Sequence, residues 1–189
     1  MPSKPIENLM DDHRLIEKVL AAMRRYASAL QSGEPVERAS IEGLVPFMRE
    51  FADDCHHGKE EHRLFPMLVE RGLPARNGPI QAMCAEHEIG RRLVGDLENA
   101  VGRHLDGHAD TAGELAATMV AIADFYARHI WKEDNVLFPM ADRVLGADEV
   151  AGLIAAFDKA DGRAGVASRE RFVRFARGLV ESSDRQNPI

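Results

Sequence analysis

The chain has 189 residues, which is enough for one domain of ordinary size with a substantial core. Hydrophobic residues make up 45% of it and charged residues 29%, as in soluble globular proteins and unlike disordered ones. A formal net charge of −7 without any basic run or stripe argues against a nucleic-acid partner. Because the sequence has no apolar run of about 18 residues, no membrane partner is expected either.

The sequence contains two cysteines, Cys55 and Cys84, which are too few to staple a domain of this size. The residues before His13 lack the apolar core of a signal peptide. Both observations predict a cytoplasmic protein with reduced thiols. Each cysteine is more simply explained as a small buried hydrophobe than as a redox sensor.

Apolar residues spaced three and four apart predict long amphipathic helices. The first stripe runs from Ile6 to Leu30 with His13 at its middle, and Gly33-Glu34-Pro35 ends it. A second long helix is expected from about Val36 to Glu70. The turn residues Arg71-Gly72-Leu73-Pro74 stop it.

The second half of the chain repeats this plan. A third stripe runs from Ile80 to Val101 and again holds a histidine, and a polar linker is expected at 102–110. The fourth stripe, from Leu115 to Met140, is the cleanest. In it, His129 and Glu133 replace two successive apolar residues on the side that faces the core.

The helical pattern shortens after Gly146. We expect a main domain at 1–146 and a C-terminal helical extension at 147–189, which could cover one end of the main domain or form a partner surface. The extension is expected to begin with a short amphipathic helix at 147–160, followed by a loop at 161–165. A last helix is expected at 168–180 and a frayed tail at 182–189.

Strand-like alternation is absent from the sequence, which predicts an all-α fold. Four long helices with short connections favour an up-down-up-down four-helix bundle. The interval from His13 to His56 is 43 residues and that from His87 to His129 is 42 residues. This spacing indicates two helical hairpins related by an approximate two-fold.

A twelve-residue segment, 56–67, returns 73 positions later as 129–140. Seven positions are identical without a gap: a His, the Lys and Glu three and four residues on, and Leu-Phe-Pro-Met. A recurring Lys carries little weight because lysines are frequent on solvated faces, but His, Glu and Pro do not recur in frame by chance. The segment is therefore a duplicated functional element. Pro66 and Pro139 lack a backbone N–H and are expected to kink their helices just after it.

Four histidines and two glutamates on the core-facing stripes form two matched sets. They are His13, His56 and Glu60, followed by His87, His129 and Glu133. A His and a Glu four residues apart on a helix project from one face and can grip one ion or an adjacent pair. Burying an unpaired carboxylate is costly, and no Lys or Arg lies on these stripes to pair with it. We therefore expect a metal, because buried His–Glu hydrogen bonds would explain one set but not its repetition.

The ligand types narrow the choice of metal. Imidazole with carboxylate suits iron, zinc or manganese, whereas the lack of cysteine pairs disfavours metals that prefer thiolate. Two ions with two histidines each, both glutamates bridging and one oxo or hydroxo bridge, would be five-coordinate. Roughly one position per ion would then be open to dioxygen, peroxide or nitric oxide, whereas a structural zinc site is closed at about four ligands.

The order His…His-x-x-x-Glu…His…His-x-x-x-Glu, with Leu-Phe-Pro after each glutamate, resembles the hemerythrin-like family, the HHE cation-binding domain. The resemblance covers about Ile6 to Leu145. It implies a four-helix bundle with a non-haem di-iron centre that binds dioxygen or related small molecules, or senses oxygen, nitric oxide or iron. By position, it implies that the two matched sets are the ligands and that Glu60 and Glu133 are the bridges.

The chain departs from the oxygen carriers of that family in two places. They have a second histidine four residues after the third-helix ligand, where this chain has Arg91. They also end with a His and an Asp five apart, whereas His129 and Glu133 are four apart. Loss of an asymmetric five-histidine centre disfavours oxygen transport and favours redox turnover or sensing, although His57 or His62 could restore a fifth ligand.

The register of the second helix is ambiguous, because His57 and Glu61 form an equally spaced pair. Alignment of the two copies on Leu-Phe-Pro-Met favours the pair at 56 and 60, since His57 falls opposite Ile130. The apolar stripe upstream of the first copy is nevertheless less clean than that of the fourth helix. In this register, His57, Glu61 and His62 are partners of the ligands or spare ligands.

Three hypotheses for function follow. The first is a binding module for dioxygen, nitric oxide or peroxide, used in sensing or protection. The second is an oxidoreductase that reduces peroxide or nitric oxide with an unknown redox partner. Tyr126, one turn before His129, could then hydrogen-bond the ligand or donate an electron, although core packing explains it equally. The third is a bundle stabilised by zinc, which predicts no redox response.

Overall fold

The computed structural model describes residues 1–164 and 166–186, and every regular element in these ranges is helical. The prediction of an all-α fold is confirmed for this part of the chain. The elements are α1 (Lys4–Gln31), α2 (Arg38–Glu42), α3 (Leu44–Pro46), η1 (Phe47–His57), η2 (Glu60–Leu64), α4 (Phe65–Glu70), α5 (Pro79–Leu105), α6 (Thr111–Lys132), η3 (Glu133–Leu137), α7 (Phe138–Val144), α8 (Ala147–Ala164) and α9 (Val166–Gln186), where η marks a π-helical segment. Among the described helices, none is long and apolar enough to cross a membrane.

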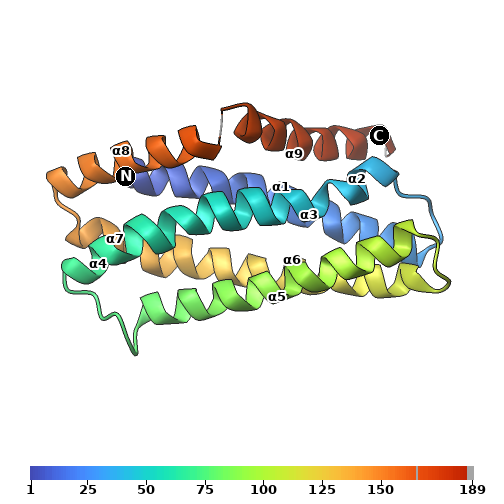
Figure 1. Ribbon diagram of the computed structural model, residues 1–189, viewed down its shortest axis with the longest axis horizontal. Coiled ribbons are helices and arrows are strands. Elements are labelled where there is room, and N and C mark those ends of the chain that lie inside the picture. Colours follow the sequence, from blue (N-terminus) through green and yellow to red (C-terminus); the bar gives the residue numbers. More distant parts are fainter. Residues whose placement is uncertain (165, 187–189) are drawn as a thin grey trace.

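The elements from α1 to α7 make up four rods that run along the long axis of the molecule (Figure 1). The first rod is α1, the second runs from α2 to α4, the third is α5, and the fourth runs from α6 to α7. α6 packs against both α1 and α5, and η1 packs against α1 and α5. Gly33, Gly72 and Gly107, with φ angles of 74°, 95° and 78°, make the turns that end the first three rods.

The second and fourth rods change helix type at the duplicated segment. The amide of Phe65 donates to the carbonyl of Glu60, and the amide of Phe138 donates to the carbonyl of Glu133. Both bonds span five residues rather than four, which widens the helix into a π-turn. The proline after each phenylalanine has no N–H with which to continue an α-helical pattern. The irregularity expected at the two prolines therefore takes the form of a π-turn directly before each of them.

The C-terminal extension lies lengthwise along α1 (Figure 1). Leu153 and Phe157 of α8 join the apolar cluster at one end of α1. Phe172, Ala176 and Leu179 of α9 join the cluster around the other end. The extension is thus packed onto the side of the rods and does not cap one end of them.

Three boundaries in the second half of the chain differ from those expected. α5 continues to Leu105, so the linker predicted from 102 begins later. α8 continues to Ala164, so the loop predicted at 161–165 is wrong up to that residue, and residue 165 lies outside the described part. Asp161 is held there by tertiary ion pairs, which outweigh the turn preference of Asp and Gly. The predicted frayed tail is helical to Gln186, and 187–189 lie outside the described residues.

Candidate metal centre

A layer of buried polar side chains separates two apolar clusters in the core. Along α1, Leu9 belongs to one cluster and Ile16 to the other, and His13 lies between them. In the fourth rod, Ile130 and Leu137 flank Glu133 in the same way. All six predicted ligands lie in this layer and are at most 2% exposed: His13, His56, Glu60, His87, His129 and Glu133.

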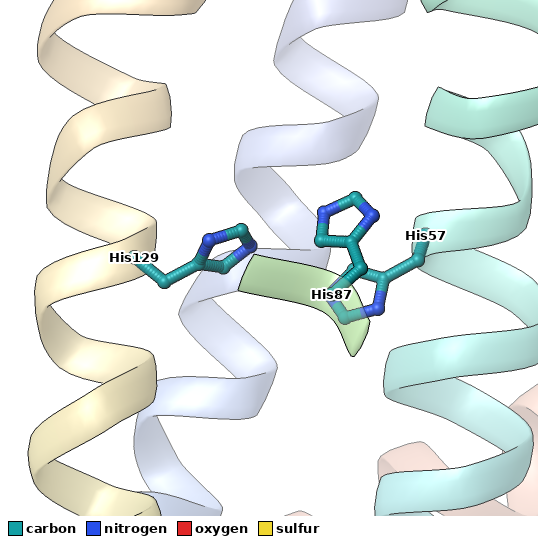
Figure 2. Close-up of side chains that lie close together, drawn as sticks. All are labelled: His57, His87 and His129. Carbon is teal, nitrogen blue, oxygen red and sulfur yellow. The ribbon is translucent and has the colours of Figure 1, made fainter. Parts of the chain in front are cut away.

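The layer contains two groups of side chains that could each hold an ion, with ligand atoms within 4.8 Å of one another. Their members are His13, His56, Glu60 and Glu133 in the first group, and His57, His87 and His129 in the second. Figure 2 shows the rings of the second group pointing toward one another from η1, α5 and α6. Each group brings together residues from at least three rods, so the site exists only in the folded chain.

The two glutamates lie between the groups. Nε2 of His13 is 3.1 Å from the Glu133 carboxylate, and Nε2 of His129 is 3.3 Å from it. Nε2 of His87 is 3.4 Å from Glu60 and 3.6 Å from Glu133. Glu60 also lies 3.8 Å from Nε2 of His56. Both carboxylates therefore border both groups, which is the placement that two bridging ligands require.

His57 belongs to the second group, although alignment of the two copies placed it opposite an apolar residue. Its side chain is 2% exposed, and its ring stacks on His87 with centroids 3.8 Å apart. The cause lies in η1, because a π-helix has more residues per turn than an α-helix and turns both His56 and His57 inward. In the fourth rod, α6 is α-helical up to Lys132 and contributes His129 alone. The unclean stripe upstream of His56 was the sequence signal for this change of period.

The other two spare residues lie outside the two groups. His62 is exposed and takes no part in the site. The Glu61 carboxylate accepts a hydrogen bond from Nδ1 of His87 at 2.6 Å. Glu61 is thus a partner of a predicted ligand, which is one of the two roles left open by the sequence.

Every histidine of the two groups has a carboxylate beside its outer ring nitrogen, Nδ1. The pairs and their N···O distances are His13–Asp134 at 2.7 Å, His56–Asp12 at 3.7 Å, His57–Asp53 at 3.1 Å, His87–Glu61 at 2.6 Å and His129–Glu86 at 3.1 Å. In four of the pairs the two atoms are hydrogen-bonded, which fixes the tautomer and the orientation of the ring and leaves Nε2 free to face an ion. At His56 the carboxylate is a charged neighbour and makes no hydrogen bond to Nδ1. Only Glu61 of the five was identified from the sequence. Asp12, Glu86 and Asp134 pair with histidines of other rods, and Asp53 lies four residues before His57, which was not among the six predicted ligands. The available signal was an acidic residue directly beside a ligand, as at Asp12, Glu86 and Asp134.

The outer carboxylates are in turn paired with cationic side chains. Arg91 binds both Asp53 and Glu61, and Arg14 binds Asp134. The recurring lysine of the duplicated segment has the same role in both copies. Lys59 pairs with Asp12 beside His56, and Lys132 pairs with Glu86 beside His129. The interpretation of this lysine as a solvated residue is wrong for Lys59, which is 0% exposed.

The inward-facing atoms of the layer have no hydrogen-bond partners among the described residues. They are Nε2 of His13, His56, His87 and His129, and both carboxylate oxygens of Glu60 and Glu133. Buried polar atoms are nearly always hydrogen-bonded, and each one left unpaired costs about 1–3 kcal/mol. A cation in each group would satisfy these atoms. The nitrogen and oxygen donors fit iron, zinc or manganese.

The electrostatics of the two glutamates lead to the same conclusion. Burial and the nearby charge of Glu133 raise the pKa of Glu60 well above its usual value. Burial also acts to raise the pKa of Glu133, but the neighbouring His129 and His13 outweigh it and lower that pKa. Without cations, the charges of the two buried glutamates therefore oppose each other. Two ionised bridges need positive charge between them.

Tyr126 lies beside the second group without being a member of it. Its ring is parallel to that of His57, with centroids 6.1 Å apart, and it is 2% exposed. A Cβ on Gly90 would lie 2.7 Å from its hydroxyl oxygen, so this glycine makes room for the phenol. Tyr126 also lines a cavity of about 320 Å³ together with Asp53 and Arg91. The tyrosine therefore borders both a candidate ligand and the cavity.

The two cysteines are free and half-buried. Sγ of Cys55 donates a hydrogen bond to Asp161 at 3.3 Å, and burial raises the pKa of this thiol to about 12. Burial also raises the pKa of Cys84. A thiolate is the reactive form of cysteine. Both residues therefore fit the simpler interpretation as structural side chains.

Comparison with known families gives one match that covers most of the chain. The family model described as the hemerythrin HHE cation binding domain matches residues 4–141. The match begins with α1 and ends within α7. It therefore includes all four rods and every residue of the two groups, and it leaves out α8 and α9.

Curated relatives are more distant. An uncharacterized protein of Mycobacterium tuberculosis is 24% identical over 163 residues, which are 86% of this chain and 63% of that protein. An uncharacterized protein of Mycobacterium bovis matches to the same extent. The iron-sulfur cluster repair protein YtfE of Yersinia pseudotuberculosis is 29% identical over 154 residues, which are 74% of this chain and 67% of that protein. The chain thus spans 63% of the length of its mycobacterial relatives.

Proposed function

Because the chain belongs to the hemerythrin HHE cation-binding domain family, we propose that it is a non-haem di-iron protein. It binds a small ligand, which is dioxygen, nitric oxide or peroxide, and serves in sensing or protection. The frame for this centre is an up-down-up-down four-helix bundle of two pseudo-symmetric hairpins in residues 1–146. A cytoplasmic location, inferred from the two cysteines, remains part of the proposal.

The proposal is carried by the buried imidazole and carboxylate atoms that converge without hydrogen-bond partners. The proposed ligands are His13 and His56 for one ion, His57, His87 and His129 for the other, and Glu60 and Glu133 as bridges between them. The sequence predicted two histidines for each ion. With His57 included, one ion has three histidines and the other has two. This restores the asymmetric five-histidine centre that is associated with oxygen binding, and its loss was the main objection to that role.

The side chains around the proposed centre support this role. Bound iron would supply open coordination positions and one-electron redox chemistry for the small ligand. Hydrogen bonds to outer carboxylates hold four of the five imidazoles with Nε2 inward, so that little reorganisation is needed when the ions enter. The apolar clusters on both sides keep the layer dry, which strengthens the electrostatic interactions inside it. The ion beside His13 and His56 has fewer protein ligands and is the proposed place of the small ligand.

An oxidoreductase is the second candidate. It is favoured by Tyr126, whose ring lies beside His57 and which borders the cavity of about 320 Å³. The Yersinia relative is named for iron-sulfur cluster repair, which supports iron as the metal and protection as the role. A zinc-stabilised structural bundle is the weaker alternative, because a structural zinc site closes around one ion at about four ligands, whereas each glutamate here lies within 4 Å of histidines of both groups.

Stopped-flow spectroscopy on the reduced, iron-loaded protein separates these functions. A stoichiometric spectral change with nitric oxide or dioxygen, without further consumption, is the result expected for a binding module. Sustained consumption of peroxide or nitric oxide in the presence of a reductant would favour the oxidoreductase. No spectral change with any of the three ligands would contradict both functions.

A further inference from the structure

The C-terminal extension reaches the layer through a buried ionic cluster. Lys59 is 0% exposed, and its ammonium has three acceptors around it. Nζ lies 2.9 Å from Asn8 Oδ1, 2.9 Å from Asp12 Oδ2 and 3.0 Å from Asp161 Oδ1. An ammonium has three N–H donors, so these contacts use its full capacity. One of the three acceptors, Asp161, comes from α8.

Asp12 connects this cluster to a proposed ligand. The residue is 0% exposed, and its Oδ2 atom lies 3.7 Å from Nδ1 of His56. Its other oxygen, Oδ1, accepts a hydrogen bond from Nη2 of Arg169 on α9 at 2.6 Å. Arg169 also lies 3.9 Å from Asp161, and its guanidinium stands over the ring of Phe51 at 5.4 Å. The carboxylate of Asp12 is therefore paired with two cations, Lys59 from the four rods and Arg169 from the extension.

The second copy of the duplicated segment provides an internal comparison. There, Lys132 pairs with Glu86, which accepts a hydrogen bond from Nδ1 of His129. Lys132 is 44% exposed and Glu86 is 18% exposed, whereas Lys59 and Asp12 are both 0% exposed. The same series of contacts, from histidine to carboxylate to lysine, thus lies near the surface in the second copy. In the other copy, α8 and α9 cover it and add Asp161 and Arg169 to it (Figure 1).

Building on the proposed di-metal centre, we propose that Asp161 and Arg169 are positioning residues for His56. Acting through Lys59 and Asp12, they hold the ion of the His13–His56 half in place. The extension consequently governs how firmly this half of the centre retains its metal, and the other half is independent of it. Loss of Arg169 would leave the two oxygens of Asp12 with one cation, so that the carboxylate could turn away from His56. Substitutions of residues that support a metal ligand in this way weaken metal binding roughly 10- to 100-fold.

The test measures the retention of cobalt(II), a probe that does not depend on which metal the protein uses. Protein loaded with two cobalt ions is mixed with a chelator, and the transfer of both ions is followed by absorbance. In Arg169→Gln we expect one ion to leave about 10-fold faster or more, with the other at the wild-type rate. The visible bands of one cobalt ion should change as well. Arg171→Gln on the same helix, which removes a surface pair with Glu50, is the matched control and should behave as wild type.

Two further variants separate positioning from general stability. Asp161→Asn removes the negative charge that α8 contributes to the cluster. It should accelerate the release of the same ion as Arg169→Gln does. Lys132→Gln changes the second copy of the duplicated segment and should accelerate the release of the other ion. Equal acceleration of both ions in Arg169→Gln, or release at wild-type rates, would overturn the inference and leave the proposed function standing. Wild-type protein that binds no cobalt would overturn the di-metal centre and the inference together.

Discussion

Arg91 donates hydrogen bonds from Nε to both carboxylate oxygens of Asp53, each at 3.0 Å. The same guanidinium donates from Nη2 to Glu61 at 2.9 Å, so one side chain holds the outer carboxylates of both His57 and His87. Arg91 stands where oxygen carriers that the sequence resembles have a histidine. In the proposed centre, His57 on the second rod would take the place of that histidine, and the arginine on the third rod pairs with the carboxylate beside it.

Replacement of Arg91 by Gln should loosen two proposed ligands at once. The guanidinium pairs with Asp53 and Glu61 together, which the shorter neutral amide of Gln cannot do. We expect a roughly 10-fold or greater loss of metal affinity in a competition with a coloured chelator. Arg92→Gln, at an exposed neighbouring position, is the control and should leave the affinity unchanged. Equal affinities of the Arg91 variant and the control would show that these contacts do not support the site.

Variants of two neighbouring histidines test the register of the second rod. His57→Ala should remove a ligand and lower metal content and thermal stability together, because the metal stabilises only the folded chain. His62→Ala changes an exposed residue and should alter neither property. The metal content of both variants can be measured by elemental analysis, and their unfolding by circular dichroism. Full metal loading of His57→Ala would restrict the ligands to the six residues predicted from the sequence.

Gly90 and Gly95, both on α5, should respond oppositely to alanine. A Cβ at Gly90 would lie 2.7 Å from the hydroxyl oxygen of Tyr126, so Ala must displace the ring and should destabilise the protein by about 1–3 kcal/mol. Nothing lies within 4 Å of a Cβ at Gly95, where Ala should stabilise the helix by about 0.5–1 kcal/mol. Urea unfolding measures both changes. A stabilising effect of Gly90→Ala would show that Tyr126 does not occupy this position.

The metal-free protein should be most stable near pH 6.5. Burial opposes charge on His13, but the hydrogen bond to Asp134 and the nearby charge of Glu133 outweigh it and raise its pKa from 6.5 to about 9. The stability that it contributes is therefore full below pH 6.5 and is lost as the pH rises through 9. Burial lowers the pKa of His56 to about 4 and that of His57 to about 3, so stability also falls as the pH drops below 6.5.

Urea unfolding of chelator-treated protein at a series of pH values measures this profile. In His13→Gln, the loss of stability on the alkaline side should be smaller, because one of the groups responsible for it is gone; His87, whose pKa its carboxylate neighbours raise against the effect of burial, still contributes. A stability that increases steadily up to about pH 9 in the wild-type protein would contradict the charge state assigned to His13. Metal-loaded protein should lack the alkaline loss, since metal binding requires neutral imidazole.

The repeat and the helical stripes were sufficient to predict the helical class and to identify six of the buried polar residues. His13, His87 and His129 lie on regular α-helices, where a period of 3.6 residues holds and side-chain direction follows from spacing. His57 could not be placed by the same rule, because η1 changes the period directly before it. The departure from a regular stripe was visible in the sequence, but its consequence for two adjacent histidines required the backbone.

Most of the residues that pair with the proposed ligands could not be identified from local patterns in the sequence. Asp12 serves His56 of another rod, and Glu86 serves His129 of another rod, so each pairing depends on how the rods pack. Lys59 resembles any surface lysine in the sequence and is buried between α1 and α8, where it contacts Asp12 and Asp161. Contacts between distant segments decide these roles, and a single sequence carries no record of them.

Metal analysis of freshly purified protein is the most direct test, together with near-ultraviolet and visible spectra recorded in the reduced state and after aeration. We expect about two irons per chain, as in di-iron carboxylate bundles, with oxo-bridge charge-transfer bands that appear in air and fade on reduction. Zinc, or no metal and a featureless spectrum in both states, would contradict the di-iron centre.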